Sequence, residues 1–281
     1  MSNNLVIGYQ NYLHDLAAAA VTADQAATNF PASNTRLVNR QIVWRTTDAA
    51  TDHYVQMDLG SALAVSFAAI LDPNIEDYQS GGYQAALQLR AADNAGFSSG
   101  VLNFGGTTHS RLTPTGSTAH IQQRVCCWSA RTGTGTLLPQ TKRYWRFQVI
   151  NAKVPVVDVF TSFGKLFVGA AWQPPKNFLY GAKIEWVDMS WNRRAPQGAS
   201  YGGRGNTYGR VAFELPLLPE ADLGTLLGIF DVVGTHTPVW ALFNEASNER
   251  HTLYCKFTER PRYVWRRSNL FDVSLAVEEE L

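Results

Sequence analysis

YVQMDLG, residues 54–60, is the stretch that decides the fold. Val55, Met57 and Leu59 occupy every second position, so an extended chain has one apolar face and one polar face. This period of two is typical of a half-buried β-strand, whereas the apolar positions of a helix repeat about every 3.6 residues. We therefore expect a strand here with one face in a core.

The same alternation recurs along the chain. In residues 144–150 it places Trp145, Phe147 and Val149 on one face, and residues 271–278 alternate in the same way close to the end of the sequence. Turn residues such as Gly105-Gly106 separate the strand candidates. The pattern predicts an all-β protein.

Helical patterns occur in two places only. From Pro219 to Val232 the leucines and Phe230 fall on one stripe, and Pro219 suits a helix start. Glycines within this stripe weaken the helix, so packing has to hold it. Asn11 to Gln25 is alanine-rich and fits either a short helix or a covered loop.

A domain boundary is expected near residue 173. Pro174-Pro175 follows an apolar strand candidate, Lys165 to Trp172. Two consecutive prolines remove two backbone donors and force an extended path, so neither a strand nor a helix continues through them. The sequence thus predicts a domain over residues 1–172 and another over residues 173–281.

Composition excludes a global electrostatic role. The chain has 24 basic and 23 acidic residues, a formal net charge of +1, so no overall field favours nucleic acid or an anionic membrane. Hydrophobic residues make up 45%, enough for a self-sufficient core. The beginning, MSNNLVIGYQ, lacks the basic and apolar regions of a signal peptide, and we expect a product synthesised as a soluble cytoplasmic protein.

Short motifs for catalysis lack the context that they need. GASYG, residues 198–202, has the G-x-S-x-G pattern of a hydrolase nucleophile elbow, but no helical pattern follows it, so a loop is expected. Glu76-Asp77, and Glu185 with Asp188, are carboxylate candidates by residue type only. We predict that the chain is not an enzyme and has no catalytic residues, and a hydrolase stays the minor alternative.

Metal and cofactor sites are not expected either. The three cysteines, Cys126, Cys127 and Cys255, are predicted to be buried thiols, although a disulfide with Cys255 or a metal site that includes His251 stays open. His109 and His120 have no third ligand nearby in the sequence, and surface loops are expected for both.

The first half resembles a known family. IVWR (42–45), the stretch ending in D-L-G (54–60) and RYWRF (143–147) occur in the order and spacing of the discoidin-like, galactose-binding-like jelly rolls. Asp58 can bond backbone amides and Gly60 can take a positive φ, as a tight corner requires. The resemblance implies a β-sandwich over residues 1–172 with Trp44 and Trp145 between its sheets.

The whole layout looks like a tail-tip or baseplate protein of a long-tailed bacteriophage. The second half, which starts NFLYG (177–181) and closes with 271–281, is similar to distal tail and tail-tube-like proteins, in which a β-sandwich with one flanking helix forms a ring. The strand candidates behind this likeness are Ile184 to Ser190, Arg210 to Leu215 and Pro238 to Phe243.

The function implied is a structural component of the virion tail, assembled in the host bacterial cytoplasm, that joins the tail tube to hub or fibre proteins. Its expected partners are itself, as a hexamer or a trimer, and tail proteins such as tube, hub, tape measure or fibres. The alternative is a carbohydrate-binding module that recognises a host surface glycan. No nucleic-acid binding is expected, and fold alone does not confer a ligand.

Each of these functions has its candidate residues. For sugar contact, the suited side chains in predicted loops are Tyr78, Tyr83, His109, Arg111 and Trp128. For assembly, we predict a glycine-rich basic loop over 193–210 that becomes ordered against a neighbouring chain. Its contact residues are Arg193, Arg194, Tyr201, Arg204, Tyr208 and Arg210.

Overall fold

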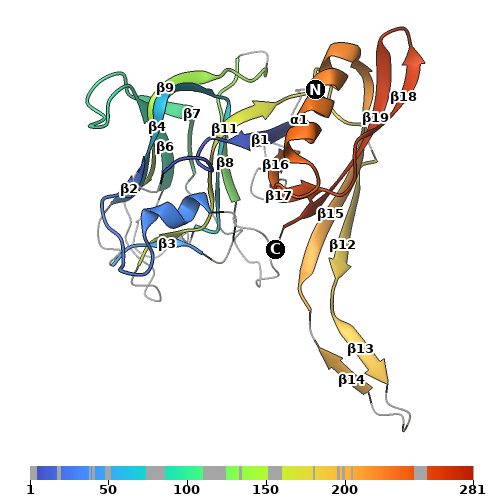
Figure 1. The fold of residues 1–281 in the computed structure, drawn as a ribbon, viewed down its shortest axis with the longest axis horizontal. Coiled ribbons are helices and arrows are strands. Elements are labelled where there is room, and N and C mark those ends of the chain that lie inside the picture. Colours follow the sequence, from blue (N-terminus) through green and yellow to red (C-terminus); the bar gives the residue numbers. More distant parts are fainter. Residues whose placement is uncertain are drawn as a thin grey trace. The chain divides into compact units, whose positions relative to one another are not determined.

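A computed structural model gives the fold in Figure 1. It describes residues 5–17, 20–37, 39, 42–47, 52–73, 86–109, 125–132, 135–150, 160–179, 181–194, 197, 200–203, 205–243 and 252–280, with the backbone alone for 86, 105–109 and 150. Within these residues, nearly all regular structure is β-strand, and α1 is the α-helix. The predicted fold class, all-β with a sandwich first and a second β unit with one flanking helix, is confirmed.

Contacts divide the chain into two compact units. The first contains Met1–Gln173 and Trp240–Leu253, and the second contains Pro174–Val239 and Tyr254–Leu281. Residues 240–253 therefore belong with the first unit, whereas the division made from the sequence assigned them to the second domain. The physical reason is that β16 (Val239–Leu242) pairs with β1 (Val6–Asn11).

The first unit has a sheet in the order β2-β4-β9-β6-β7. The bounds of its strands are β2 Val21–Ala23, β4 His53–Val65, β9 Gln140–Ile150, β6 Ala86–Ala92 and β7 Leu102–His109. The alternation predicted for β4 and β9 is confirmed, because Val55, Met57, Trp145, Phe147 and Val149 are all fully buried. These side chains form one wall of the core.

A second layer of the first unit runs in the order β16-β1-β11-β5-β8. Its further bounds are β11 Leu166–Trp172, β5 Phe67–Leu71 and β8 Val125–Ser129. Side chains from both layers share one core, and the Trp128 ring of β8 meets the Phe147 ring of β9 edge to face at 5.4 Å. The first unit is thus a β-sandwich.

Short elements close one end of the sandwich. They are β3 (Trp44–Arg45), β10 (Ser162–Phe163) and the 3-10 helix η2 (Ala32–Arg36). β3 pairs with β10, and the ring of Trp44 packs on that of Phe163 at 4.8 Å. Trp44 Nε1 donates a hydrogen bond to the carbonyl of Gln25 at 3.0 Å, which satisfies its buried donor.

The D-L-G corner differs from the expected strand end. Asp58 Oδ1 accepts a hydrogen bond from the amide of Gly60 at 2.8 Å, and Gly60 has φ 77°, as predicted. However, β4 continues to Val65, and the register shifts between Asp58 and Leu63. The corner is therefore a bulge inside one long strand.

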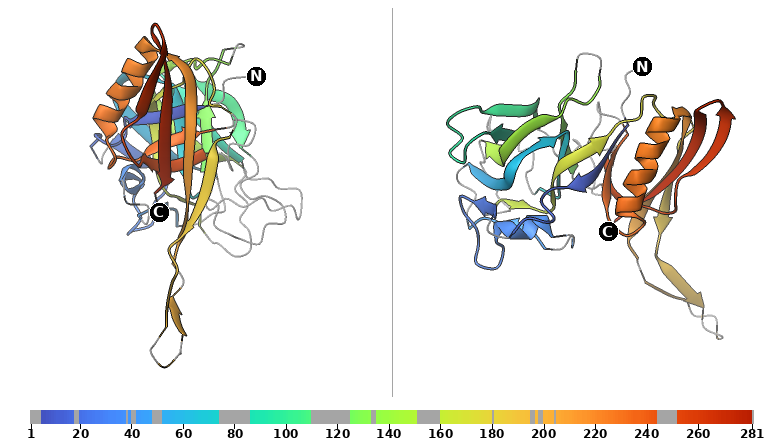
Figure 2. Two further views of the ribbon diagram at one scale, coloured as in Figure 1. Left: turned by 90° about the vertical axis from the view of Figure 1, so that its right-hand side faces the viewer. Right: turned by 45° about the horizontal axis from the view of Figure 1, so that its top comes forward.

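The second unit contains a sheet in the order β12-β15-β19-β17, with β18 also paired to β19 (Figures 1 and 2). The bounds are β12 Lys183–Asp188, β15 Thr207–Pro219, β19 Leu270–Glu279, β17 Thr252–Phe257 and β18 Arg262–Arg267, with β13 Trp191–Arg194 and β14 Ser200–Gly203 as a separate hairpin. The strands predicted over Arg210 to Leu215 and 271–278 lie in β15 and β19.

Helix α1 (Glu220–Val233) confirms the helix predicted over Pro219 to Val232. Pro219 precedes the first turn, and Gly234 ends the helix with φ 58°. Leu223 and Leu226 are buried beneath it, and its Phe230 ring packs on Phe257 of β17 at 5.8 Å. Packing against the sheet thus holds a helix that its glycines weaken.

The helix considered over Asn11 to Gln25 does not form in the part of this segment that the structure describes. Residues 12–15 make turns and Val21–Ala23 is strand β2, which pairs with β4. The alanine-rich stretch is therefore closer to the covered-loop alternative. Sheet pairing, which depends on distant residues, overrides the local helix preference.

Candidate functional site

The predicted sugar-contact residues are mostly outside the described part of the chain. Tyr78, Tyr83 and Arg111 lie outside the described residues. For His109, at the end of β7, only the backbone is described. The structure consequently brings none of these side chains into a described site, and their sugar contact stays a prediction.

Trp128 corrects the prediction of an exposed loop. It lies in β8 with 1% of its surface exposed, inside the shared core of the sandwich. A side chain enclosed in this way has no free ring face on which a sugar can stack. β8 is buried on both faces, so its sequence VCCWS lacks the alternation that would have identified a strand.

The predicted assembly loop is largely a β-hairpin. β13 pairs with β14, and β12 pairs with β15, so the described residues of 183–194 and 200–212 form a long two-stranded arm with an irregular step in its middle (Figure 1). Met189 N donates to the carbonyl of Asn206 at 3.0 Å and keeps the strands together at this step. The expected irregular loop is therefore a paired hairpin in the described residues, and its ordering by contact with a neighbouring chain stays a prediction.

The arm brings together most of the predicted assembly residues. Arg193 and Arg194 lie in β13, and Tyr201 lies in β14 directly opposite Arg193. The Arg193 guanidinium also lies 5.8 Å from the Trp191 ring centre. Tyr208 and Arg210 lie in β15, away from the hairpin end, and Arg204 is outside the described residues.

Exposed apolar side chains follow the arm, and the sequence reasoning identified only Tyr201 among them. Each has more than half of its surface exposed in the described chain. We call them the arm apolar set: Ile184 59%, Trp186 59%, Met189 59%, Trp191 54% and Tyr201 60%. Large apolar side chains exposed together on one element are candidates for an interaction site in a soluble protein. The signal in the sequence was the alternation within KIEWVD (183–188), which predicted a strand but not which face it leaves open.

A second exposed apolar group lies on β18. Tyr263, Val264 and Trp265 are 52%, 60% and 69% exposed. The Trp265 ring stacks on Phe271 of β19 with centroids 5.8 Å apart and planes at 30°, and Tyr263 meets the same ring edge to face. The rings are therefore held in place by the strand pairing while their outer surfaces stay open.

Charges alternate across one face of the second-unit sheet. Glu185, Arg210, Glu278 and Lys256 lie side by side on β12, β15, β19 and β17. Opposite charges on neighbouring strands stabilise a sheet by about 0.2–1 kcal/mol per pair. A hydrogen bond from Lys183 holds the pKa of Glu185 below its usual range, so this carboxylate stays charged at neutral pH.

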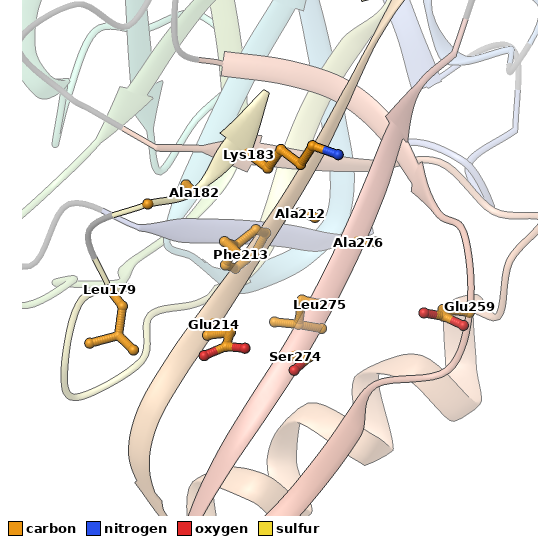
Figure 3. Close-up of a pocket in the computed structure, with 11 residues that line it drawn as sticks. Leu179, Ala182, Lys183, Ala212, Phe213, Glu214, Glu259, Ser274, Leu275 and Ala276 are labelled. Atoms are coloured by element: carbon orange, nitrogen blue, oxygen red, sulfur yellow. The ribbon is translucent and has the colours of Figure 1, made fainter. Parts of the chain in front are cut away.

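The same face carries a cavity of about 320 Å³, shown in Figure 3. Small side chains line it, including Ala212 and Ala276, with Glu214 and Glu259 among its polar groups. No histidine or cysteine is among the described residues that line it. The cavity therefore holds no described His–Cys or His–Ser pair for nucleophilic catalysis.

In the first unit, a polar network covers the outer face of the five-stranded sheet. Arg146 is stacked between the rings of Tyr54 and Phe97, each 4.0 Å from its guanidinium carbon, and it donates to Gln56 Oε1 at 3.1 Å through Nε. Burial lowers the pKa of Arg146 from its ordinary value, and the guanidinium stays charged. These groups can offer hydrogen bonds to a polar ligand.

Lys165 is a buried cation in the same unit. Its side chain is enclosed, with the residue 3% exposed, and Nζ donates to the carbonyls of Asn34 at 3.2 Å and Ile42 at 2.6 Å. Burial lowers the pKa of the Lys165 ammonium to about 8. A neutral amine keeps donors for both carbonyls, so the contacts survive loss of the proton.

This burial predicts a pH dependence of stability. Between about pH 8 and the ordinary lysine pKa, the unfolded chain holds a proton that the folded chain has released, so the free energy of unfolding rises with pH. We expect a gain of about 2–4 kcal/mol over this window, since each pKa unit corresponds to about 1.4 kcal/mol. Lys165→Met should lack this gain. Denaturant unfolding of both proteins at pH 7 to 10.5 tests the difference, and parallel curves would contradict it.

The described residues contain no group of three or more metal-ligating side chains. They also include no helix that is long and apolar enough to cross a membrane. The three cysteines are buried, as predicted. The described part of the chain therefore offers no metal centre with protein ligands.

No protein-family profile and no curated protein matches this sequence. Among solved structures, the chain is similar to chitosan-binding module 1 of a chitosanase/glucanase from Paenibacillus, at 13% identity over 57% of this chain and 99% of that one, with a TM-score of 0.40. It is similar to a family 32 carbohydrate-binding module of Clostridium perfringens in complex with galactose, at 19% identity over 55% and 96%, with a TM-score of 0.35. A fucose-binding module of Streptococcus pneumoniae shows 12% identity over 57% and 95%, with a TM-score of 0.37. These likenesses assign no ligand to this chain.

Proposed function

We propose that this chain is a structural subunit of a bacteriophage tail tip or baseplate. In this function it forms a ring in the virion tail and joins the tail tube to hub or fibre proteins. The observation that supports it is the exposed arm of the second unit, which presents the arm apolar set to its surroundings. The phage setting follows from the resemblance of the sequence to tail-tip proteins.

The arm is suited to bind another protein chain. Trp191 and Tyr201 lie on one face of the hairpin with Arg193 between them, because Arg193 is opposite Tyr201 and Trp191 is opposite Gly203. Tryptophan, tyrosine and arginine are the residues most enriched at the energetic centres of protein interfaces. Leaving such rings in water costs free energy that burial against a neighbour recovers, at roughly 25 cal/mol per Å².

Light scattering of the purified chain tests this proposal. We expect a hexamer or a trimer, and we expect Trp191→Ser combined with Tyr201→Ser to shift the population toward monomer. Val232→Ser is the matched control, since Val232 is an equally exposed apolar residue, at 69%, on α1 and not on the arm. A monomer both in solution and in assembled particles would overturn the proposal.

Amide hydrogen exchange gives a second readout for the same proposal. The hairpin β13–β14 has few contacts beyond its own ladder, so its amides should exchange faster in isolated subunits than in the assembled ring. Equal protection in both states would mean that the arm takes no part in assembly.

Carbohydrate binding by the first unit is the second candidate. The polar network around Arg146 favours it. Arg90 and Gln148 lie beside Arg146 on the same sheet face, where Arg90 Nη1 donates to Gln148 Oε1 at 3.4 Å. Both side chains can form hydrogen bonds with sugar hydroxyls. Calorimetric titration with galactose and with chitosan oligosaccharides tests it. Binding should be lost in Arg90→Ala and kept in Lys142→Ala, and absence of heat with every sugar would remove this candidate.

A further inference from the structure

The second-unit sheet ends in two strands that each lack a partner on one side within the described chain. β12 pairs with β15 alone and stands at the end of the strand order, and β18 pairs with β19 alone. Both strands have six residues. An edge strand presents unpaired amides and carbonyls that can pair with another chain, and natural edges are normally blunted by charges or proline. These two edges carry charged residues as well, but each also has large exposed apolar side chains, Ile184 and Trp186 on β12 and Tyr263 and Trp265 on β18.

The largest exposed apolar side chains of both edges, Ile184 and Trp186 on β12 and Tyr263 and Trp265 on β18, lie on the same face of the sheet. Ile184 of β12 is opposite Val211, and Val211 is opposite Val277. Val277 is in turn opposite Phe257, on which Phe230 of α1 packs, so this is the face that bears the helix. Directly opposite residues of antiparallel strands share a face.

β18 fits the same pattern. Tyr263 is opposite Val273 and Trp265 is opposite Phe271, and Val273 is opposite the buried Leu215 of β15. The exposed rings of β18 therefore lie on the helix face, like Ile184 and Trp186 at the other edge. A sheet that continued from one copy to the next would keep all of these apolar side chains on one side.

Strand direction makes the two edges compatible. Each neighbouring pair in the order β12, β15, β19, β18 is antiparallel, so β12 and β18 run in opposite directions. When a second copy is placed beside the first in the same orientation, its β12 runs antiparallel to β18. This contact is head-to-tail and can close a ring.

We propose that β12 of one copy pairs antiparallel with β18 of a second copy, with Val187 opposite Val264. This inference rests on the proposed function, and it identifies the strands through which neighbouring subunits of the ring make contact. In this register Trp186 faces Trp265, an aromatic cross-strand pair of the kind that stabilises sheets. The occupant of the β18 edge is thus a second copy of this chain.

Charge favours this register over one of its two face-preserving neighbours, and the other neighbour, which places Val187 opposite Arg266, loses the pairing of Trp186 with Trp265. The proposed register places Glu185 opposite Arg266 on the face away from the helix. Arg266 lies on that face because its Nε donates a hydrogen bond to Asp272 Oδ2 at 2.5 Å. A shift of two residues that keeps the same faces would place Lys183 opposite Arg266. Like charges directly opposite each other destabilise a sheet, so the shifted register is disfavoured.

The two edges lie at different levels of the sheet. β12 is beside the part of β15 that pairs with Ala276 to Glu278 of β19, whereas β18 is beside Leu270 to Ser274. Successive copies are therefore offset along the strands. A closed ring accommodates such an offset by tilting its strands relative to the ring axis.

Disulfide trapping tests the register. Val187→Cys combined with Val264→Cys should give covalent dimers and higher species on mild oxidation, because directly opposite Cβ atoms are roughly 4.5–5.5 Å apart. Val187→Cys with Arg262→Cys is the matched control, since its diagonal separation of roughly 7–8 Å is too long. The single variants control for the buried native cysteines. Equal trapping in both pairs would overturn the proposed register.

A charge exchange tests the same contact without new thiols. Glu185→Arg should weaken association by about fivefold, the effect of about 1 kcal/mol per cross-strand pair, and Arg266→Glu should do the same. The double variant Glu185→Arg with Arg266→Glu should recover most of the loss. Circular dichroism of each variant checks that the subunit stays folded.

The outcomes separate this inference from the proposed function. A chain that is monomeric under all conditions would remove both. A chain that forms a ring, but shows neither selective trapping at Val187 and Val264 nor rescue by the charge exchange, would remove only the pairing of β12 with β18.

Discussion

Trp145→Ala will lower the free energy of unfolding of the first unit by about 3–5 kcal/mol, the range for truncating a large buried aromatic side chain. The Trp145 ring is fully enclosed in the core between the two layers of the sandwich. It meets the Phe104 ring edge to face at 5.1 Å, and its Nε1 donates to the carbonyl of Lys142 at 3.1 Å. The substitution therefore leaves a cavity and also removes the donor for that carbonyl.

Denaturant unfolding followed by hydrogen exchange of the β9 amides measures this loss. Tyr144→Ala is the matched control, because Tyr144 is the preceding residue on the opposite face and is only half-buried. We expect the control to cost less than about 1.5 kcal/mol, as for substitutions outside a core. Equal losses in the two variants would mean that β9 does not present alternate faces to core and solvent.

The alternation that identified β4, β9 and β19 worked because each of these strands has one buried face and one open face. β8 has no open face, so Trp128 was misplaced in a loop. The hairpin β13–β14 has the opposite difficulty: both of its strands are exposed, apart from partly covered Gly203, and no apolar period marks them. Local patterns also cannot show that β16 pairs with β1, since that contact joins residues more than two hundred positions apart in the sequence.

The candidate interface was foreseen in part for a related reason. The composition of residues 193–210 predicted that their arginines and tyrosines contact another chain. The described residues of this segment are mostly paired strands and not a loop. Trp186 and Trp265 were not identified as exposed. An alternating strand pattern predicts that the apolar face is buried, and it does not show that a strand at the edge of the sheet has its apolar face exposed. Only the pairing order of the sheet shows that β12 and β18 are edges without a second partner strand among the described residues.

Gly169→Ala will destabilise the first unit by about 3 kcal/mol, at the upper end of the usual cost of overpacking. A Cβ added at Gly169 would lie 1.8 Å from the carbonyl oxygen of Gln10. At this point the antiparallel pairing of β1 with β11 has a register shift, between Gly8 and Gln10. The strands cannot simply separate. Two hydrogen bonds join Val168 to the end of β1, since its amide donates to Asn11 Oδ1 at 3.3 Å and its carbonyl accepts from Tyr12 N at 3.0 Å.

Gly224→Ala supplies the contrast for this prediction. Gly224 lies in α1 with nothing within 4 Å of an added Cβ, so alanine should stabilise the helix by about 0.5–1 kcal/mol through the lower entropy of the unfolded chain. The same chemical change is thus expected to have opposite signs at the two positions. Denaturant unfolding of both variants decides the point. A tolerated Gly169→Ala would mean that β1 and β11 are farther apart than their pairing requires, and the β1 layer of the sandwich would then need a different register.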